Sequence, residues 1–414
     1  MEKIYIITHA FPYYLGEYFM ESEINYYDGK DVVITFLPLS KGKNGTVRKL
    51  KKGISVDTFL CENPKKNTLG KIKTLLTILV NIYFYKEIFY IIRNRKLHFS
   101  TVKTAFLVAS EILKRKKQFD LFISNIEFSN RIIFYSYWFD YQTYSLILLK
   151  KKYPGIKIIC RAHGYDVFCE RREFSYMPYK QQFGNLVDKI FAISKSGKKY
   201  LEKNYSINKE NIEISRLGTV SPDCLSKISP DGALFVLSVS GCVAVKRIDR
   251  IIDGIVTFGD ENPSINIIWT HIGDGEERER LEVYAKKVSS NKNVKCEFLG
   301  EVSNKEIHEY YSKQYIDVFI NTSESEGVPV AIMEAMSYGV PIIAPNVGGI
   351  DEEVDTDNGI LLEVGFDRED LASALYKLYL NKNSSIRTVS YNKWNIKYNA
   401  EKNYLQFIES IKLI

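Results

Sequence analysis

The stretch SESEGVPVAIMEAMSYGVPIIAPNVGG, residues 323–349, decides the fold. Pro329 is pre-set for the first turn of a helix, where a missing N–H costs nothing. Good helix formers run from Ala331 to Tyr338, and Gly339 ends the run. The apolar segment PIIAP (341–345) follows and predicts a short strand buried in a parallel sheet.

Two carboxylates with seven residues between them flank this predicted helix start. Glu326 is expected in the loop before the helix, and Glu334 on its early turns. The free N–H groups at a helix start attract an anion, phosphate above all, while carboxylates accept hydrogen bonds from sugar hydroxyls. The pair therefore indicates a ligand that carries both hydroxyls and phosphates. The alternative is a solvated acidic loop before an ordinary helix.

The pattern E-G-V-P-V-A-I-M-E-A-M-x-x-G-x-P-I-I-A-x-x-V-G-G closely resembles the donor-site signature of the retaining glycosyltransferases of family 4. The resemblance implies the GT-B fold, an α/β fold in which the parallel sheets of two Rossmann-like domains face each other across a cleft. It implies that Glu334 accepts hydrogen bonds from the ribose of a nucleotide-sugar, most often a UDP-sugar. It also implies that Glu326 holds the transferred sugar together with the amides of Gly327 and Val328.

The composition fits two domains in a reducing compartment. A chain of 414 residues can form two domains of roughly 200 residues, and 45% hydrophobic residues supply ample core. Six scattered cysteines without a C-x-x-C pair argue against disulfides and a structural zinc site. The first strand, Ile4–Ile7, follows no basic leader, so we expect no secretory signal and a cytoplasmic protein.

The charge is distributed unevenly along the chain. Residues 1–228 hold 38 basic and 21 acidic residues, whereas residues 229–414 hold 19 and 29. A basic first half predicts contact with an anionic surface. Anionic phospholipid, a lipid-linked pyrophosphate and nucleic acid are the candidate partners.

Alternating strands and helices predict two Rossmann-like domains, one at 1–219 and one at 233–398. Two prolines and several turn formers predict a linker at 220–232. The segment FDLFIS (119–124) predicts a strand of the first domain. By the resemblance, a last helix at 399–414 crosses back onto the first domain, which is expected to bind the acceptor.

Two segments of the first domain carry candidate site residues. The phrase RAHGYDVF, which begins at Arg161, places His163 at the carboxyl end of a predicted strand. It resembles the H-G-x-D element of the exopolysaccharide- and capsule-building branch of family 4, in which the histidine lines the donor sugar. Asp166 is the acid of that element, although a lone histidine is usually an ordinary polar residue. Gly16 lies in the first predicted loop, which the resemblance places against the donor phosphates.

Two adjacent cations follow the first strand of the second domain. The resemblance puts Lys246 on the family lysine that contacts the donor diphosphate, although a solvated pair is the commoner case. Gly241 stands where the family usually has a phosphate-binding arginine. Arg247 is expected to take the place of that arginine. The motif GDG (273–275) lacks the full G-x-G-x-x-G, so NAD binding is not expected.

An apolar, aromatic segment at 74–92 is flanked by basic residues. Its uninterrupted part, Thr74 to Tyr85, is too short to span a bilayer. It predicts either a buried core helix or a helix lying in a membrane interface.

The resemblance to family 4 implies a retaining, metal-independent hexosyltransferase with catalytic residues His163, Glu326, Lys246 and Arg247. No cofactor is expected beside the donor substrate. No D-x-D pair lies at the end of a predicted strand, and the family works without one, so no metal is expected. The acceptor is expected to be a glycan on a polyprenyl pyrophosphate at the inner face of the plasma membrane, in O-antigen, capsule or exopolysaccharide assembly. The alternatives are a GT-B nucleotide-sugar epimerase and a non-enzymatic module that binds membrane or nucleic acid. No nucleic-acid-binding motif is present.

Overall fold

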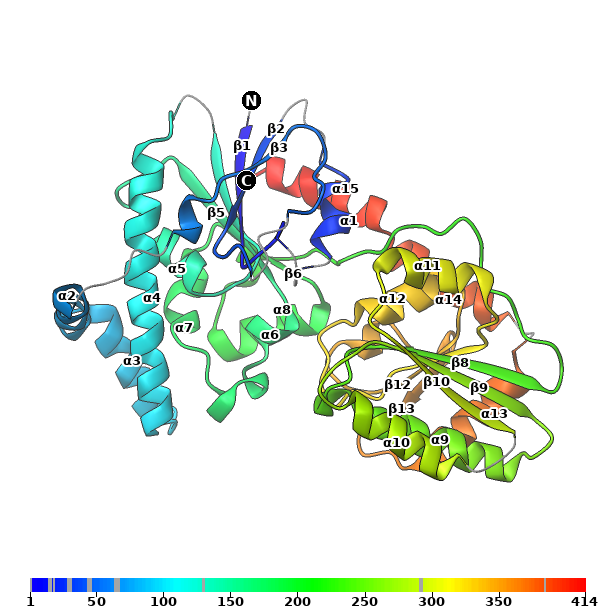
Figure 1. Ribbon diagram of the computed structural model, residues 1–414. Helices are drawn as coiled ribbons and strands as arrows, with labels where there is room; N and C mark the ends of the chain where they lie inside the picture. The colour runs from blue at the N-terminus through cyan, green and yellow to red at the C-terminus, as the bar shows by residue number, and fades with distance from the viewer. Residues whose placement is uncertain are drawn as a thin grey trace. The chain divides into compact units, whose positions relative to one another are not determined.

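The chain divides into two compact units, one of Met1–Ser215 with Tyr404–Ile414 and one of Arg216–Asn403 (Figure 1). The computed structural model describes residues 2–13, 17, 19–27, 32–42, 47–62, 68–128, 131–289, 293–382 and 385–414. Gly16, one of the predicted donor-site residues, lies outside the described residues.

The first unit is built on a parallel sheet with the strand order β3-β2-β1-β4-β5-β6-β7. Its strands are β1 (Glu2–Thr8), β2 (Val32–Pro38), β3 (Ile54–Val56), β4 (Ile132–Ser136), β5 (Ile156–Ala162), β6 (Lys189–Ala192) and β7 (Ile212–Ile214). Its helices are α1 (Met20–Ile24), α2 (Thr68–Leu79), α3 (Ile82–Arg93), α4 (Phe99–Ser124), α5 (Tyr141–Ile147), α6 (Gly164–Val167), α7 (Lys180–Phe183) and α8 (Lys195–Tyr205).

Helices cover both faces of this sheet, because successive side chains of a buried strand point to opposite sides. In β4, Ile132 and Phe134 belong to the core beneath α4, α5 and α8. Ile133 and Tyr135 belong to a second core on the other face, with α1.

The C-terminal helix α15 (Ala400–Lys412) completes that second core. Phe407, Ile408 and Ile411 are buried in it, and the Arg161 guanidinium lies 4.2 Å from the centre of the Phe407 ring. The end of the chain thus packs onto the first unit.

The predicted strand at 119–124 is wrong, because these residues form the last turns of α4. Phe119, Phe122 and Ile123 are buried, and their spacing of three and four residues places them on one side of a helix. A short apolar run fits a strand and a helix equally well. The strand of this region is β4, which begins eight residues later.

The second unit has a parallel sheet with the order β10-β9-β8-β11-β12-β13. Its strands are β8 (Ala233–Val239), β9 (Asn266–Ile272), β10 (Val294–Gly300), β11 (Val318–Ile320), β12 (Ile342–Pro345) and β13 (Gly359–Leu362). Its helices are α9 (Ile248–Glu261), α10 (Arg278–Val288), α11 (Asn304–Lys313), α12 (Val330–Ser337), α13 (Arg368–Leu380) and α14 (Ile386–Lys397). Figure 1 shows α9, α10 and α13 on one face of this sheet and α11, α12 and α14 on the other.

Residues 220–232, for which the sequence predicts a linker, lie within the second unit. The backbone N–H of Ser226 donates to the carbonyl of Tyr338, and that of Ser229 donates to Asp317 Oδ1, each over 3.0 Å. Hydrogen bonds to two loops of the unit therefore fix this segment.

Candidate functional site

Three loops meet at the carboxyl edge of the second sheet, where the loops of a parallel α/β sheet form binding sites. They follow β8, β11 and β12, which are neighbours in the sheet. The predicted cations lie in the first loop, Glu326 lies in the second, and the glycines of the NVGG segment lie in the third.

Glu334 lies on α12, which begins after Pro329 as the sequence predicts. The side chain is only 7% exposed, and no described residue donates a hydrogen bond to its carboxylate. Burial raises the pKa of the Glu334 carboxyl to about 7. A desolvated carboxylate without a donor is suited to accept hydrogen bonds from hydroxyls of a ligand.

Glu326 and Lys246 form an ion pair between two of the loops. The distance from Lys246 Nζ to Glu326 Oε1 is 2.6 Å, and Asn321 Nδ2 lies 3.4 Å from the same oxygen. Glu326 is 8% exposed, so a single cation holds a largely buried carboxylate. The structure thus brings together two predicted site residues that lie 80 positions apart.

The third loop supports the loop that carries Glu326. The N–H of Gly349 donates to the carbonyl of Gly327 over 2.8 Å. A Cβ atom added to Gly348, whose φ is +64°, would lie 1.7 Å from the carbonyl oxygen of Glu326. The amides of Gly327 and Val328 donate to no acceptor among the described residues, which leaves them available to an anion.

Arg247 is bound by two carboxylates. Its guanidinium donates to Asp249 over 3.0 and 3.1 Å and to Glu324 Oε1 over 2.5 Å. The hydrogen bonds that Arg247 donates to these two carboxylates raise the pKa of its guanidinium. Arg247 lies beside Lys246, as predicted, but a phosphate would have to displace at least one carboxylate.

Glu353 is a buried acid that the sequence did not single out as a site residue. Its side chain is fully buried, and neither carboxyl oxygen has a hydrogen-bond partner among the described residues. Burial raises the pKa of Glu353 well above its ordinary value, and the charges of Glu326 and Glu352 add to the shift. A buried carboxyl with a raised pKa therefore lies near Glu326, and its sequence signal is its place after the paired glycines.

His163 follows β5 in the first unit, at the strand end that the sequence predicts. It is 6% exposed, and neither ring nitrogen has a hydrogen-bond partner among the described residues. The rings of Phe19, Tyr137 and Trp138 surround it, with centroids 5.6, 5.0 and 4.5 Å away.

Asp166 binds the backbone around His163. Its Oδ1 accepts the N–H of His163 over 2.5 Å, and its Oδ2 accepts the N–H of Phe139 over 2.7 Å. These hydrogen bonds fix the loop that carries His163, and contact of Asp166 with the donor stays a prediction.

A second polar group near His163 escaped the sequence analysis. His9 follows β1, its Nε2 lies 3.2 Å from Asp140 Oδ2, and its ring stacks on Trp138 at 5.5 Å. Trp138 Nε1 donates to Glu17 over 2.7 Å, and Glu17 also accepts three backbone N–H groups of residues 9–11. The only sequence signal for this group is a histidine directly after the first strand.

Among the residues that the structure describes, no group of three or more His, Cys, Asp or Glu side chains is arranged to hold a metal ion.

Comparisons with known proteins identify the domain that carries the three loops. Residues 226–394 match the family model of the glycosyl transferases group 1. The O-antigen biosynthesis glycosyltransferase WbnH of Escherichia coli is 30% identical over 210 residues, which cover 50% of this chain and 56% of WbnH. Protein CapJ of Staphylococcus aureus is 31% identical over 213 residues, which cover 49% of this chain and 50% of CapJ. The chain thus spans about half the length of these curated relatives.

The fold is shared over the whole chain. The structure of HepE from Anabaena, solved in complex with UDP, superimposes with a TM-score of 0.63 and 15% identity over 100% of both chains. The chain therefore has the GT-B fold, as predicted, and residues 226–394 form a glycosyltransferase group 1 domain. The predicted resemblance to glycosyltransferases of O-antigen biosynthesis is confirmed by WbnH.

Proposed function

We propose that this protein is a retaining, metal-independent glycosyltransferase of bacterial surface polysaccharide assembly. The observation that carries the proposal is the pairing of Lys246 with Glu326, together with the buried, unpartnered Glu334 on the helix that follows, within a glycosyltransferase group 1 domain. The names of WbnH and CapJ support an O-antigen or capsule pathway, and the UDP in HepE supports a UDP-sugar as donor.

Each residue has a proposed role toward the donor. Glu334 accepts hydrogen bonds from the ribose hydroxyls, and Glu326 holds the transferred sugar together with the amides of residues 327 and 328. Lys246 turns from Glu326 to the diphosphate. Arg247 joins it after leaving Glu324, whose side chain is 53% exposed. His163 contacts the sugar.

The proposed chemistry is a front-face substitution. The bond between the anomeric carbon and the diphosphate oxygen breaks, and the acceptor oxygen bonds the carbon from the same face. The acceptor proton passes to the departing phosphate, whose growing charge Lys246 and the helix amides stabilise.

The acceptor is proposed to be a glycan on a polyprenyl pyrophosphate, bound by the first unit at the inner face of the plasma membrane. The excess of basic residues before residue 229 supports an anionic, membrane-borne acceptor.

Thermal unfolding in the presence of a panel of nucleotide-sugars tests the donor. Ligand at 100 times its dissociation constant stabilises the protein by roughly 2.7 kcal/mol. We expect one UDP-sugar to raise the melting temperature of the wild type clearly more than that of Glu334→Ala. If no nucleotide-sugar stabilises the wild type, the donor proposal is wrong. Release of an epimerised sugar without an acceptor would instead indicate an epimerase.

A further inference from the structure

Helices α2 and α3 expose an apolar face to solvent. This outer face consists of Ile72, Leu76, Leu79, Ile82, Phe89 and Ile92, which are between 44% and 65% exposed. On each helix the spacing of three, four or seven residues places these side chains on one side. Val80, between the helices, is 82% exposed. A cluster of exposed apolar side chains on each of two successive helices marks an interaction site.

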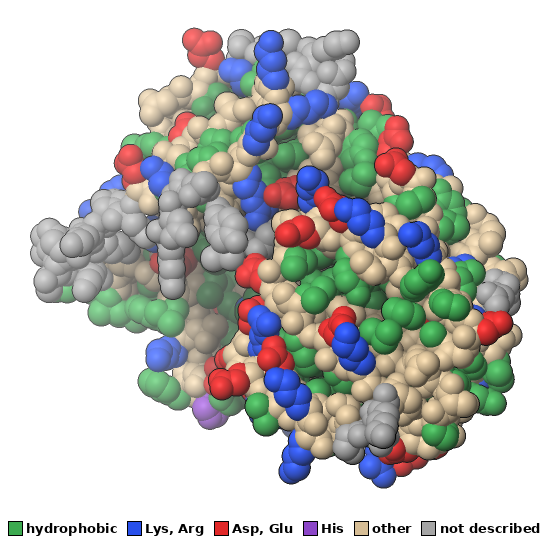
Figure 2. All heavy atoms as spheres, turned by 45° about the vertical axis from the view of Figure 1, so that its right-hand side comes forward, with side chains coloured by type: hydrophobic (Ala, Val, Ile, Leu, Met, Phe, Trp, Pro, Cys, Tyr) green, Lys and Arg blue, Asp and Glu red, His purple; other side chains and the backbone are tan. Residues whose placement is uncertain are grey.

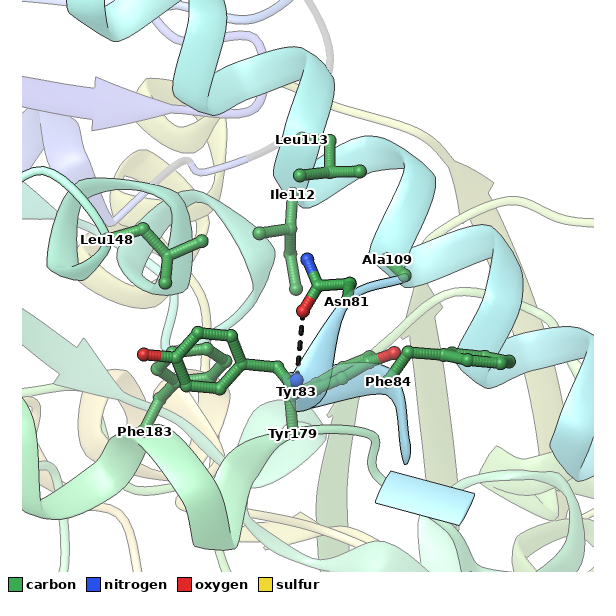
Figure 3. Close-up of a pocket in the computed structure, with 9 residues that line it drawn as sticks. All are labelled: Asn81, Tyr83, Phe84, Ala109, Ile112, Leu113, Leu148, Tyr179 and Phe183. Carbon is green, nitrogen blue, oxygen red and sulfur yellow. Dashed lines mark hydrogen bonds between the residues drawn. The ribbon is translucent and has the colours of Figure 1, made fainter. Parts of the chain in front are cut away.

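The opposite side of α3 is fixed to the protein, so the sequence prediction of a buried core helix holds for only half of the helix. Figure 1 shows α2 and α3 beside α4, and Figure 3 shows Phe84 among side chains of α4 and of residues 179–183. The carboxylate of Glu87 accepts hydrogen bonds from Tyr176 and Gln182 over 2.8 and 2.6 Å. Asn81 caps the helix by accepting the N–H of Tyr83. These contacts fix which side of α3 packs on the protein and which side faces solvent.

Within residues 72–110, which include most of α2 and all of α3, the exposed charges are all positive. Between residues 72 and 110, the one acid is Glu87, which is buried and hydrogen-bonded. The exposed charged side chains of this range are Lys73, Lys86, Arg93, Arg95 and Lys103. By contrast, Figure 2 shows acidic and basic side chains mixed over the face of the second unit that it turns forward.

We propose that the outer face of α2 and α3 lies in the surface of an anionic lipid bilayer, with its apolar side chains among the acyl chains and its cations at the headgroups. This proposal deepens the membrane part of the proposed function and names the surface that makes the contact.

A lipid surface fits better than a second copy of the chain. Two copies that met through this face would bring their lysines and arginines together without an acid to pair them. The helices also do not cross the bilayer. Among the described residues no single helix is long and apolar enough to span a membrane, and α2 and α3 pass that test only together, bent by 64°. Helix α3 is moreover packed on α4.

Co-sedimentation of the full chain with vesicles tests the proposal. The wild type should sediment with phosphatidylglycerol vesicles at low salt, and less at high salt or with phosphatidylcholine alone. Leu76→Ser with Ile82→Ser and Phe89→Ser should lower the partition coefficient about tenfold or more. The matched control replaces three equally exposed apolar residues of the second unit, by Val283→Ser, Val364→Ser and Leu380→Ser, and should bind like the wild type.

A second pair of variants separates local charge from net charge. Lys73→Gln with Lys86→Gln and Arg93→Gln should lower binding about tenfold or more, since each cation near an anionic surface contributes about fivefold. Arg280→Gln with Lys305→Gln and Lys313→Gln removes the same charge from the second unit and should change binding much less.

The proposal is overturned if the wild type fails to sediment at low salt, or if the outer-face variant binds like its control. It is also overturned if the wild type is a dimer that binds no lipid and that the outer-face variant dissociates, since the occupant would then be a second copy. Vesicle binding needs no nucleotide-sugar, so its failure is distinct from a failure to bind the donor.

Discussion

Glu334 and Glu353 are carboxyls that the second unit buries without a hydrogen-bond donor among the described residues. Burying an unpaired carboxylate is costly, so the structure keeps a proton on such a group to higher pH. A ligand that supplies hydroxyl donors would recover this cost at Glu334. No such ligand contact is proposed for Glu353.

Donor affinity should depend on the ionisation of Glu334. Hydroxyl donors favour the charged form, and the pKa of the free carboxyl is about 7. We expect the dissociation constant for the preferred nucleotide-sugar to fall several-fold between pH 6 and pH 8. Titration calorimetry should show a pH-independent constant for Glu334→Gln, and affinity lower by about tenfold or more for Glu334→Ala. An unchanged constant in Glu334→Ala would refute the ribose assignment.

Glu353 should make stability decrease with rising pH. Its pKa in the folded protein lies above the ordinary value, so its contribution is complete below the unfolded pKa and is lost as pH rises through the folded pKa. The Glu353→Gln side chain has the shape of the protonated carboxyl but does not ionise. Its free energy of unfolding should exceed that of the wild type at pH 8 by on the order of 1 kcal/mol or more. Urea unfolding at pH 5 and pH 8 measures the difference in free energy of unfolding between the variant and the wild type. Glu363→Gln, at an exposed position, is the control and should show no such difference at either pH.

Arg247 is the residue for which the sequence hypothesis and the observed contacts differ most. Its guanidinium is occupied by Asp249 and Glu324, yet it stands beside the lysine proposed to bind the diphosphate. A diphosphate leaving group gains charge as the sugar bond breaks, so a second cation should stabilise it.

We therefore predict that Arg247→Ala and Lys246→Ala lower turnover by comparable factors, on the order of 10²–10³. Gly241→Arg should recover part of the activity of Arg247→Ala, because a Cβ at Gly241 meets only the carbonyl of Asp274 at 3.5 Å. Steady-state transfer rates of the single variants and the double variant test this prediction. Near-normal turnover of Arg247→Ala would show that its carboxylate pairs are structural.

At the scale of elements, one loop positions another. The segment after β12 approaches the segment before α12 so closely that only a glycine fits at position 348. The positive φ of Gly348 and the short contact with the Glu326 carbonyl both exclude a side chain.

Gly348→Ala should thus displace Glu326 and abolish detectable donor binding, although every charged residue of the site is still present. Gly365→Ala is the matched control, because Gly365 also has a positive φ, +91°, but no atom within 4 Å of an added Cβ. It should lower stability by about 1 kcal/mol and leave donor binding unchanged. Equal donor affinity of the two variants in calorimetry would contradict the role of the contact.

At the scale of the molecule, the two units have separate hydrophobic cores. One core lies between the sheet of the second unit and α9, α10 and α13, while the cores of the first unit lie on both faces of its own sheet. The C-terminal residues belong to the first unit although they follow the second in the chain.

Differential scanning calorimetry should therefore resolve two unfolding transitions. The nucleotide-sugar should raise the melting temperature of only one of them, the transition of residues 216–403. Phe407→Ala removes a buried ring from the first unit and should lower the other transition, by about 3–5 kcal/mol in free energy. Leu405→Ala, on the same helix and 47% exposed, is the control and should change stability much less. If the donor shifted the melting temperatures of both transitions together, the two units would not unfold independently.

The sequence by itself determined the two parallel α/β units, helix α12 and the strand after it. Those features follow from side-chain periodicity and turn residues, which act over a few neighbouring positions. The same local information gave a wrong prediction at residues 119–124, because a pattern of six residues is compatible both with a strand and with the end of α4.

The tertiary structure alone decided which distant residues meet. Lys246 reaches Glu326 because β8 and β11 are adjacent in the sheet, and the sequence does not state that order. The ionisation of Glu334 and Glu353 depends on burial by the whole unit. The exposure of α2 and α3 likewise follows from which side of α3 packs on α4, and an apolar sequence all around a helix does not specify that side.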